Sequence, residues 1–151
     1  MNQNDVKEIT FFVPGLPIAA GSKKGFVNRK TGGVIITDAN KRTKPWQSQV
    51  RSAAATEMQD APLMQGALAL VVVFTMPRPK SHFGTGRNAG VLKESAPYFH
   101  TSPPDATKLT RAIEDAMTKV VWTDDALVAE QLIRKVYGDK PGASITVRRM
   151  E

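Results

Sequence analysis

The chain has 151 residues, a length that suits one domain with one core, and its 21 lysines and arginines against 14 acids give a net charge of +7. It contains no cysteine, which excludes a disulfide framework and a thiolate metal site. No window approaches the roughly 20 consecutive apolar residues of a membrane span, and residues 1–13 lack the basic start and cleavage site of an export signal, so we expect a cytoplasmic protein without membrane contact.

The first half of the chain is expected to form a strand, a basic loop or hairpin, and a helix. The β-branched and aromatic run 6–13 predicts a strand that ends at the turn 14–17. Residues 23–37 place glycines around short apolar pieces, which is consistent with a surface loop or a ragged hairpin. A helix is expected from Thr43, with Pro45 in its first turn and apolar residues at spacings of three and four.

Basic residues are concentrated early in the chain. Between positions 20 and 51, eight lysines and arginines stand against a single acid, Asp38. A net positive charge alone is equally consistent with a solvated surface that has no dedicated ligand, but this clustering favours the binding of nucleic-acid phosphates. The residues expected to make these contacts are Lys23, Lys24, Arg29, Lys30, Lys41, Arg42, Lys44 and, from a later segment, Arg78.

The second half is expected to complete a sheet. The apolar run 67–76 predicts a buried central strand, and the proline-rich segment 77–104 predicts a long excursion over the surface. A helix at 105–119, a strand at 126–137, a turn at 138–142 and a strand at 143–150 follow. Together the elements predict a mixed α+β fold of the broad α/β class, with one domain over residues 1–151, a central mixed sheet of about four to five strands and two main helices.

Aspartates flank the second predicted helix. Asp105 stands at its start, and Asp124 and Asp125 are expected to begin the strand after it, so a helix-then-strand return could bring them to one edge. Converging carboxylates are ligands for Mg²⁺, which can activate water for phosphodiester hydrolysis. Lys108 or Arg111, on one face of the helix with Asp115, could stabilise the charge of the transition state.

Each acid also has a structural interpretation. Asp105 alone is more typical of a helix N-cap, and Asp115 of an ion pair with Arg111 four residues earlier. Asp124 and Asp125 are typical of turn residues before a strand. Only their combination favours a functional site.

Two other residue types could serve a functional site but have simpler interpretations. Histidines in surface loops are usually solvated, which favours that state for His82 and His100. Trp46 and Trp122 lie beside apolar periodic residues and are expected in the core.

The combination of acidic and basic residues around the second predicted helix resembles the signature of the RusA family of Holliday junction resolvases. The family pattern is an aspartate, a second aspartate two residues later, Asn or Lys, Leu and a basic residue, followed by an Asp-Ala turn of helix and a late Asp-Asp pair. The likeness extends more weakly over most of the chain. The matching residues are Asp105, Lys108, Leu109, Arg111, Asp115, Ala116, Asp124, Asp125, Val128 and Lys135.

The resemblance implies that Asp105 and Asp125 are metal-binding catalytic acids with Asp124 beside them, and that Arg111 replaces a catalytic lysine. Thr107 stands where the second metal-binding aspartate is expected, and it brings no negative charge. The family also implies Mg²⁺ or Mn²⁺ as cofactor, a homodimer that makes paired nicks in a four-way DNA junction, and a bacterial or phage setting at the nucleoid.

Three functions remain open from the sequence. The first is a metal-dependent junction endonuclease in DNA recombination and repair. The second is a non-catalytic branched-DNA-binding protein in which Thr107 records the loss of part of the metal site. The third is an RNA-binding accessory protein that uses basic loops with Phe26, Trp46, Tyr98 and Phe99 available for stacking.

Overall fold

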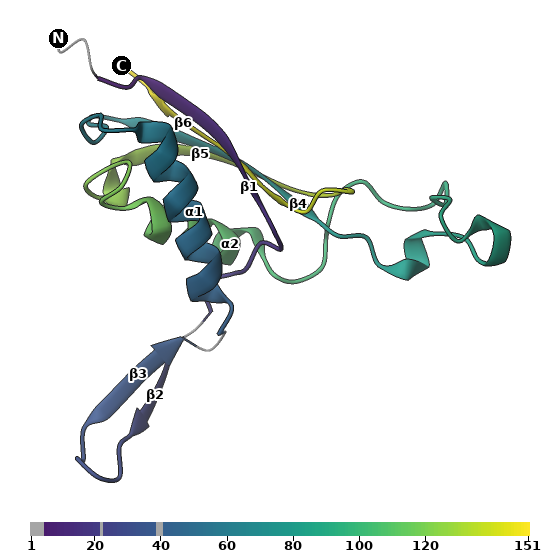
Figure 1. The fold of residues 1–151 in the computed structure, drawn as a ribbon, viewed down its shortest axis with the longest axis horizontal. Coiled ribbons are helices and arrows are strands. Elements are labelled where there is room, and N and C mark those ends of the chain that lie inside the picture. The colour runs from purple at the N-terminus through teal and green to yellow at the C-terminus, as the bar shows by residue number, and fades with distance from the viewer. Residues whose placement is uncertain (1–4, 22, 39–40) are drawn as a thin grey trace.

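A four-stranded mixed sheet carries two helices on one face, as the computed structural model shows for residues 5–21, 23–38 and 41–151 (Figure 1). The strand order is β1-β6-β4-β5. The strands are β1 (Glu8–Pro14), β4 (Leu68–Met76), β5 (Val128–Tyr137) and β6 (Gly142–Arg149), and the helices are α1 (Thr43–Met58) and α2 (Ala106–Met117). The predicted mixed fold with two main helices is confirmed.

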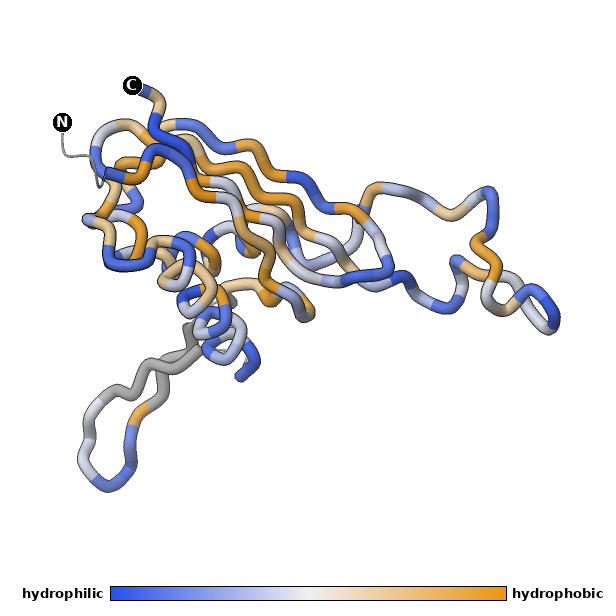
Figure 2. Tube along the Cα trace, turned by 45° about the horizontal axis from the view of Figure 1, so that its top comes forward, coloured by the Kyte–Doolittle hydropathy of each residue, from blue (hydrophilic) through white to orange (hydrophobic). Residues whose placement is uncertain are grey.

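Strand β4 is internal, as its nearly all-apolar sequence predicts. It pairs antiparallel with β6 and parallel with β5, and Val72 lies between Ile145 and Ile133 in these two ladders. Alternate residues point to opposite faces of a strand, and those of β4 that face the helices are almost fully buried. Figure 2 shows the apolar residues of neighbouring strands running side by side through the sheet. The buried residues of β4 on this face are Leu68, Leu70, Val72 and Phe74.

Helix α1 packs on the sheet through residues spaced by four. Trp46, Val50, Ala54 and Met58 are buried, because this spacing places them on one face of a helix. Polar side chains then tie α1 to α2. Gln47 Nε2 donates to the Ala112 carbonyl of α2 at 3.1 Å, and Arg51 Nε donates to the Ala116 carbonyl, one turn later, at 3.3 Å.

Helix α2 begins where the sequence predicts. The carboxylate of Asp105 accepts a hydrogen bond from the Lys108 amide at 2.8 Å, which is the geometry of an N-cap. Leu109 and Ile113 are fully buried against the sheet. After the helix, Trp122 is fully buried and its indole nitrogen donates to the Thr118 hydroxyl at 3.1 Å, so its predicted place in the core is confirmed. Neither helix of the described chain is long and apolar enough to span a bilayer.

The basic segment before α1 forms a hairpin that projects from the body of the protein (Figure 1). Strand β2 (Lys23–Val27) pairs antiparallel with β3 (Val34–Asp38), and the two form a sheet of their own. The side chains of Lys23 and Lys24 lie outside the described part of the structure. Arg29 and Lys30, near the tip, are exposed.

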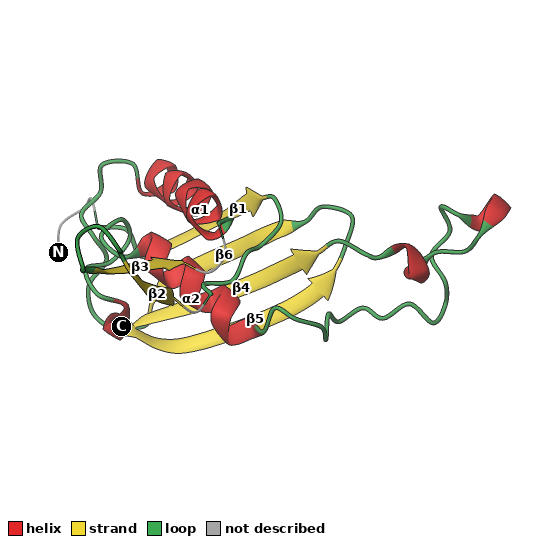
Figure 3. Ribbon diagram, turned by 90° about the horizontal axis from the view of Figure 1, so that it is seen from below, coloured by secondary structure: helices red, strands yellow, loops and turns green. Residues whose placement is uncertain are grey.

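Residues 77–104, called the arm from here on, leave the end of β4 and extend away from the sheet (Figures 1 and 3). Two short 3-10 turns, Lys80–His82 and Gly86–Asn88, are its helical elements among the described residues. Where the arm returns, its backbone pairs with the end of β5. The Tyr137 amide donates to the Tyr98 carbonyl at 2.9 Å, and the His100 amide donates to the Lys135 carbonyl at 3.0 Å.

The start of β5 differs from the prediction. A 3-10 turn, Asp125–Leu127, precedes the strand, which begins at Val128 and not at residue 126. The Asp124 carboxylate accepts a hydrogen bond from the Ala126 amide at 2.8 Å. This short-range bond favours a turn over an extended chain, so the two aspartates precede the strand instead of beginning it.

The face of the sheet opposite the helices carries no helix of the described chain (Figure 1). Phe12 on β1 is 46% exposed and Leu132 on β5 is 51% exposed. Between these edges lie the half-buried Val71 and Val73 of β4. This open face is therefore a mixed surface with several apolar side chains.

Candidate active site

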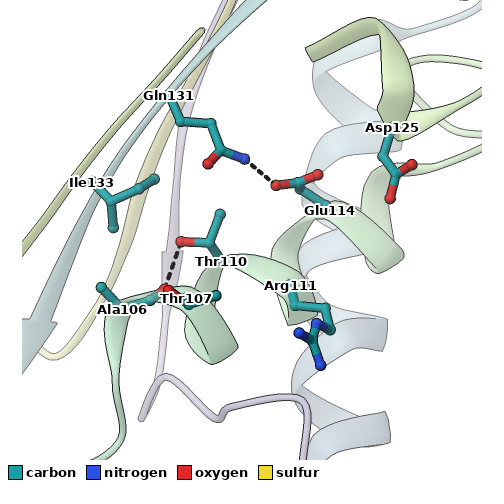
Figure 4. A pocket seen from close by; sticks show the side chains of 8 residues that line it. All are labelled: Ala106, Thr107, Thr110, Arg111, Glu114, Asp125, Gln131 and Ile133. Atoms are coloured by element: carbon teal, nitrogen blue, oxygen red, sulfur yellow. Dashed lines mark hydrogen bonds between the residues drawn. The ribbon is translucent and has the colours of Figure 1, made fainter. Parts of the chain in front are cut away.

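A pocket of about 320 Å³ lies between the exposed side of α2 and the first half of β5 (Figure 4). Helix α2 contributes side chains at spacings of three and four, which place them on one face. Strand β5 contributes two side chains two residues apart, and Asp125 comes from the turn between these elements. The lining residues are Ala106, Thr107, Thr110, Arg111, Glu114, Asp125, Gln131 and Ile133.

Glu114 is the half-buried acid of this pocket. Its carboxylate accepts a hydrogen bond from the side-chain amide of Gln131, drawn as a dashed line in Figure 4. Burial raises the pKa of Glu114, and the negative charge of Asp125 raises it further, while the hydrogen bond from Gln131 opposes both effects. Two carboxylates thus act on each other within one pocket.

Asp125 and Arg111 line the same pocket, which a shared catalytic role of the two residues would require. Asp125 is exposed in the first position of the 3-10 turn before β5. Arg111 is exposed on α2, one turn after Thr107. Thr107 also lines the pocket, so the position that lacks the family's second aspartate belongs to the same pocket as Asp125. An anion held here would have both a guanidinium and hydroxyl groups within the lining.

Asp105 and Lys108 line a different, neighbouring pocket of about 580 Å³. There the ammonium of Lys135 donates to the carbonyls of Ser102 and Pro104 at 2.9 Å each, which fixes the segment that leads into α2. The structure therefore brings Asp125 together with Arg111 and does not place Asp105 in their pocket.

Asp124 has a local role in the structure, because its carboxylate accepts the hydrogen bond from the Ala126 amide and it does not line the pocket of Asp125. Across the described residues, no three His, Asp or Glu side chains gather closely enough to form a metal cluster. The strongest pair of acids is Asp125 with Glu114. Sequence reasoning missed Glu114 and its partner Gln131.

The residues predicted to contact nucleic acid fall on three parts of the structure. Arg29 and Lys30 lie near the hairpin tip, and Lys41, Arg42 and Lys44 lie at the start of α1, where all three are exposed. No acid occupies the first turn of α1 to offset this charge.

Arg78 has contacts of its own at the base of the arm. It is half-buried and donates to the Pro97 carbonyl at 2.7 Å, and its guanidinium lies 5.3 Å from the centre of the Tyr137 ring. Its guanidinium therefore holds the two ends of the arm together.

Comparison with known families matches the sequence profile described as Endodeoxyribonuclease RusA to residues 14–148 of the chain. The chain belongs to the RusA endodeoxyribonuclease family. The match spans both helices, all of β4 and β5, and both pockets, so the resemblance seen in the acidic motif is confirmed for nearly the whole chain. No curated protein matches the sequence. RusA membership makes the protein a nuclease of the hydrolase class and makes DNA its partner.

Proposed function

We propose that this RusA protein resolves four-way DNA junctions in recombination and repair, by phosphodiester hydrolysis that depends on a divalent cation, Mg²⁺ or Mn²⁺. The observation that carries the proposal is the pocket that joins Asp125 to Arg111 and Thr107 beside α2. A carboxylate, a guanidinium and hydroxyl groups around one open space are suited to a metal ion and a phosphate together.

The donor set of the pocket consists of oxygen atoms, which are the ligands that Mg²⁺ prefers. In nuclease and polymerase sites this ion is commonly held by one or two carboxylates, with the remaining positions filled by substrate phosphate and water. When bound, the ion would lower the pKa of a water molecule and offset charge on the leaving oxygen. Asp125 would hold it, and the absence of an acid at position 107 leaves room for a second ligand from elsewhere in the pocket.

Arg111 has the role of binding the scissile phosphate. Water attacks phosphorus in line, the new P–O bond forms as the bond to the 3′ oxygen breaks, and the 3′ oxygen leaves with a proton, giving a 5′-phosphate and a 3′-hydroxyl. A planar guanidinium can donate two hydrogen bonds to the phosphate oxygens and stabilise the charge that develops on them. The exposed position of Arg111 leaves it accessible to a DNA strand.

Two further features support junction DNA as the substrate. The exposed basic residues of the hairpin and of the start of α1 offer contacts to phosphates that do not depend on base sequence. A second copy of the chain, packed on the open face of the sheet, would supply the two active sites that paired nicks require. The exposed Phe12 and Leu132 give that face the apolar character of a homodimer interface.

Asp125→Asn tests the catalytic proposal most directly. With a synthetic four-way junction in Mg²⁺ or Mn²⁺, we expect the rate of cleavage to fall by about 100-fold or more, because asparagine lacks the charge that would hold the cation. Each factor of ten corresponds to about 1.36 kcal/mol of lost transition-state stabilisation. Junction binding should persist. Asp139→Asn, in the exposed turn after β5, makes the same chemical change outside the pocket and should cleave normally. Tight junction binding by the native protein without cleavage in either metal would support the non-catalytic alternative, and preference for single-stranded RNA would support the RNA-binding one.

Asp105→Asn tests whether the neighbouring pocket takes part in the same reaction. Asparagine caps helices about as well as aspartate, so this change removes the negative charge and preserves the start of α2. A loss of cleavage without a loss of stability would assign Asp105 a role in catalysis. Unchanged cleavage would confine it to its observed capping contact with the Lys108 amide.

A further inference from the structure

Thr107 and Glu114 lie along one edge of α2 and line the same pocket. A separation of seven residues is close to two turns of helix, so the two side chains differ in direction by only about 20° and lie about 10 Å apart along the axis. Thr107 is at the position where the family pattern has its second metal-binding aspartate. The helix therefore lacks an acid at one end of the pocket and carries one at the other.

The surroundings of Glu114 are unusual for a glutamate with a purely structural role. It is half-buried, and Asp125 lines the same pocket. Arg111 supplies the basic side chain of that lining, so the pocket holds two carboxylates and one guanidinium. A divalent cation between the two carboxylates would offset their mutual repulsion.

Gln131 fixes the direction of the Glu114 side chain. Its amide donates to one carboxylate oxygen of Glu114 from strand β5, across the pocket (Figure 4). The second carboxylate oxygen is left for another partner. In metal sites, a residue that binds the metal is typically oriented by a hydrogen bond from a neighbouring residue that does not itself bind the metal.

Resting on the nuclease function proposed above, we propose that Glu114 is a ligand of the divalent cation together with Asp125, and that it supplies the carboxylate that position 107 lacks. Two carboxylates are sufficient for Mg²⁺ or Mn²⁺, since water and substrate phosphate complete the coordination. Gln131 is then a positioning residue that acts through Glu114. Glu114 lies outside the acidic positions that the family pattern specifies, so the assignment is a property of this chain.

Binding of Mn²⁺ to the full chain without DNA, measured by calorimetry, tests the proposal independently of cleavage. Glu114→Gln keeps the shape of the side chain and removes its charge, and we expect it to weaken Mn²⁺ binding about tenfold or more. Glu130→Gln is the matched control, because residue 130 is exposed and alternates to the opposite face of β5 from Gln131. It should bind Mn²⁺ within about twofold of the native chain.

A second measurement tests whether Glu114 is structural. In metal-free buffer, Glu114→Gln should melt at the same temperature as the native chain or higher, because it removes one of the two carboxylate charges that line the pocket. A lower melting temperature together with native Mn²⁺ binding would show that Glu114 is structural and would overturn the proposal.

The outcomes separate this inference from the nuclease proposal. If the native chain cleaves junctions and Glu114→Gln binds Mn²⁺ as tightly as the native chain, the role of Glu114 is refuted and the nuclease stands. If Mn²⁺ binding depends on Glu114 but no junction is cleaved, the cation site stands and the nuclease proposal fails. Absence of Mn²⁺ binding by the native chain overturns the assignment of Glu114.

Discussion

Lys135 joins β5 to the segment that leads into α2, so its removal is expected to loosen that junction. Its ammonium donates 2.9 Å hydrogen bonds to the carbonyls of Ser102 and Pro104 from a half-buried position. Lys135→Met keeps the apolar stem of the side chain and removes both bonds. A hydrogen bond from a charged donor contributes about 1.5–3 kcal/mol net. The carbonyl of the exposed Ser102 regains water, so we expect a loss of about 2 kcal/mol in the free energy of unfolding.

Urea unfolding of the native chain and of Lys135→Met measures this loss. In thermal unfolding it corresponds to a decrease in Tm of about 4–8 °C for a domain of this size. The charge of Lys135 also lowers the pKa of His100, so the same variant should raise that pKa, which NMR titration of the ring protons can follow. Lys140→Met, in the exposed turn after β5, is the matched control. A change in stability below about 0.5 kcal/mol, the range of an ordinary surface substitution, would refute the role assigned to Lys135.

Three further predictions concern pH, assembly and DNA binding. Burial and the neighbouring positive charge of Lys135 place the pKa of His100 below its ordinary value, so the unfolded chain takes up a proton first as pH falls. The contribution of His100 to stability is therefore complete above about pH 6.5 and declines below it. His100→Phe should flatten this decline in urea midpoints measured at pH 8 and 5.5. Leu132→Lys places a charge on the open face of the sheet and should weaken the proposed dimer about tenfold or more in sedimentation, whereas a monomeric native chain would exclude that interface. Replacing both Arg29 and Lys30 by alanine should reduce the slope of log Kd against log salt by about two for junction DNA, and an unchanged slope would place the hairpin tip away from phosphates.

Most of the fold could be predicted from the sequence because its elements have strong local patterns. The run of β4 is apolar at every position but Thr75, which predicts a buried central strand, and the structure places it between β6 and β5. The spacing of Trp46, Val50 and Ala54 defines the buried face of α1. The boundary before β5 was wrong by two residues, because a single hydrogen bond to the Asp124 carboxylate stabilises a 3-10 turn there.

The candidate site was predicted less completely, since it depends on which side chains meet across the chain. The sequence paired Asp105 with Asp125 from their places at the ends of one helix, but the structure sets them in neighbouring pockets. Glu114 was missed because it falls outside the family pattern. A signal for it was present, since positions 107, 110, 111 and 114 are all polar and follow the spacing of one helix face. The contribution of Gln131 came only from the fold, which lays β5 beside α2.

The arm leaves the sheet and returns to it at nearby points, with its ends held by Arg78 and by the backbone of β5. The entropy of closing such a loop grows only with the logarithm of its length, so doubling the loop costs roughly 0.6 kcal/mol. The reach of this segment can consequently lengthen or shorten through insertions and deletions while the folded body keeps its stability. Changes in the length of the arm are therefore largely uncoupled from changes in the core.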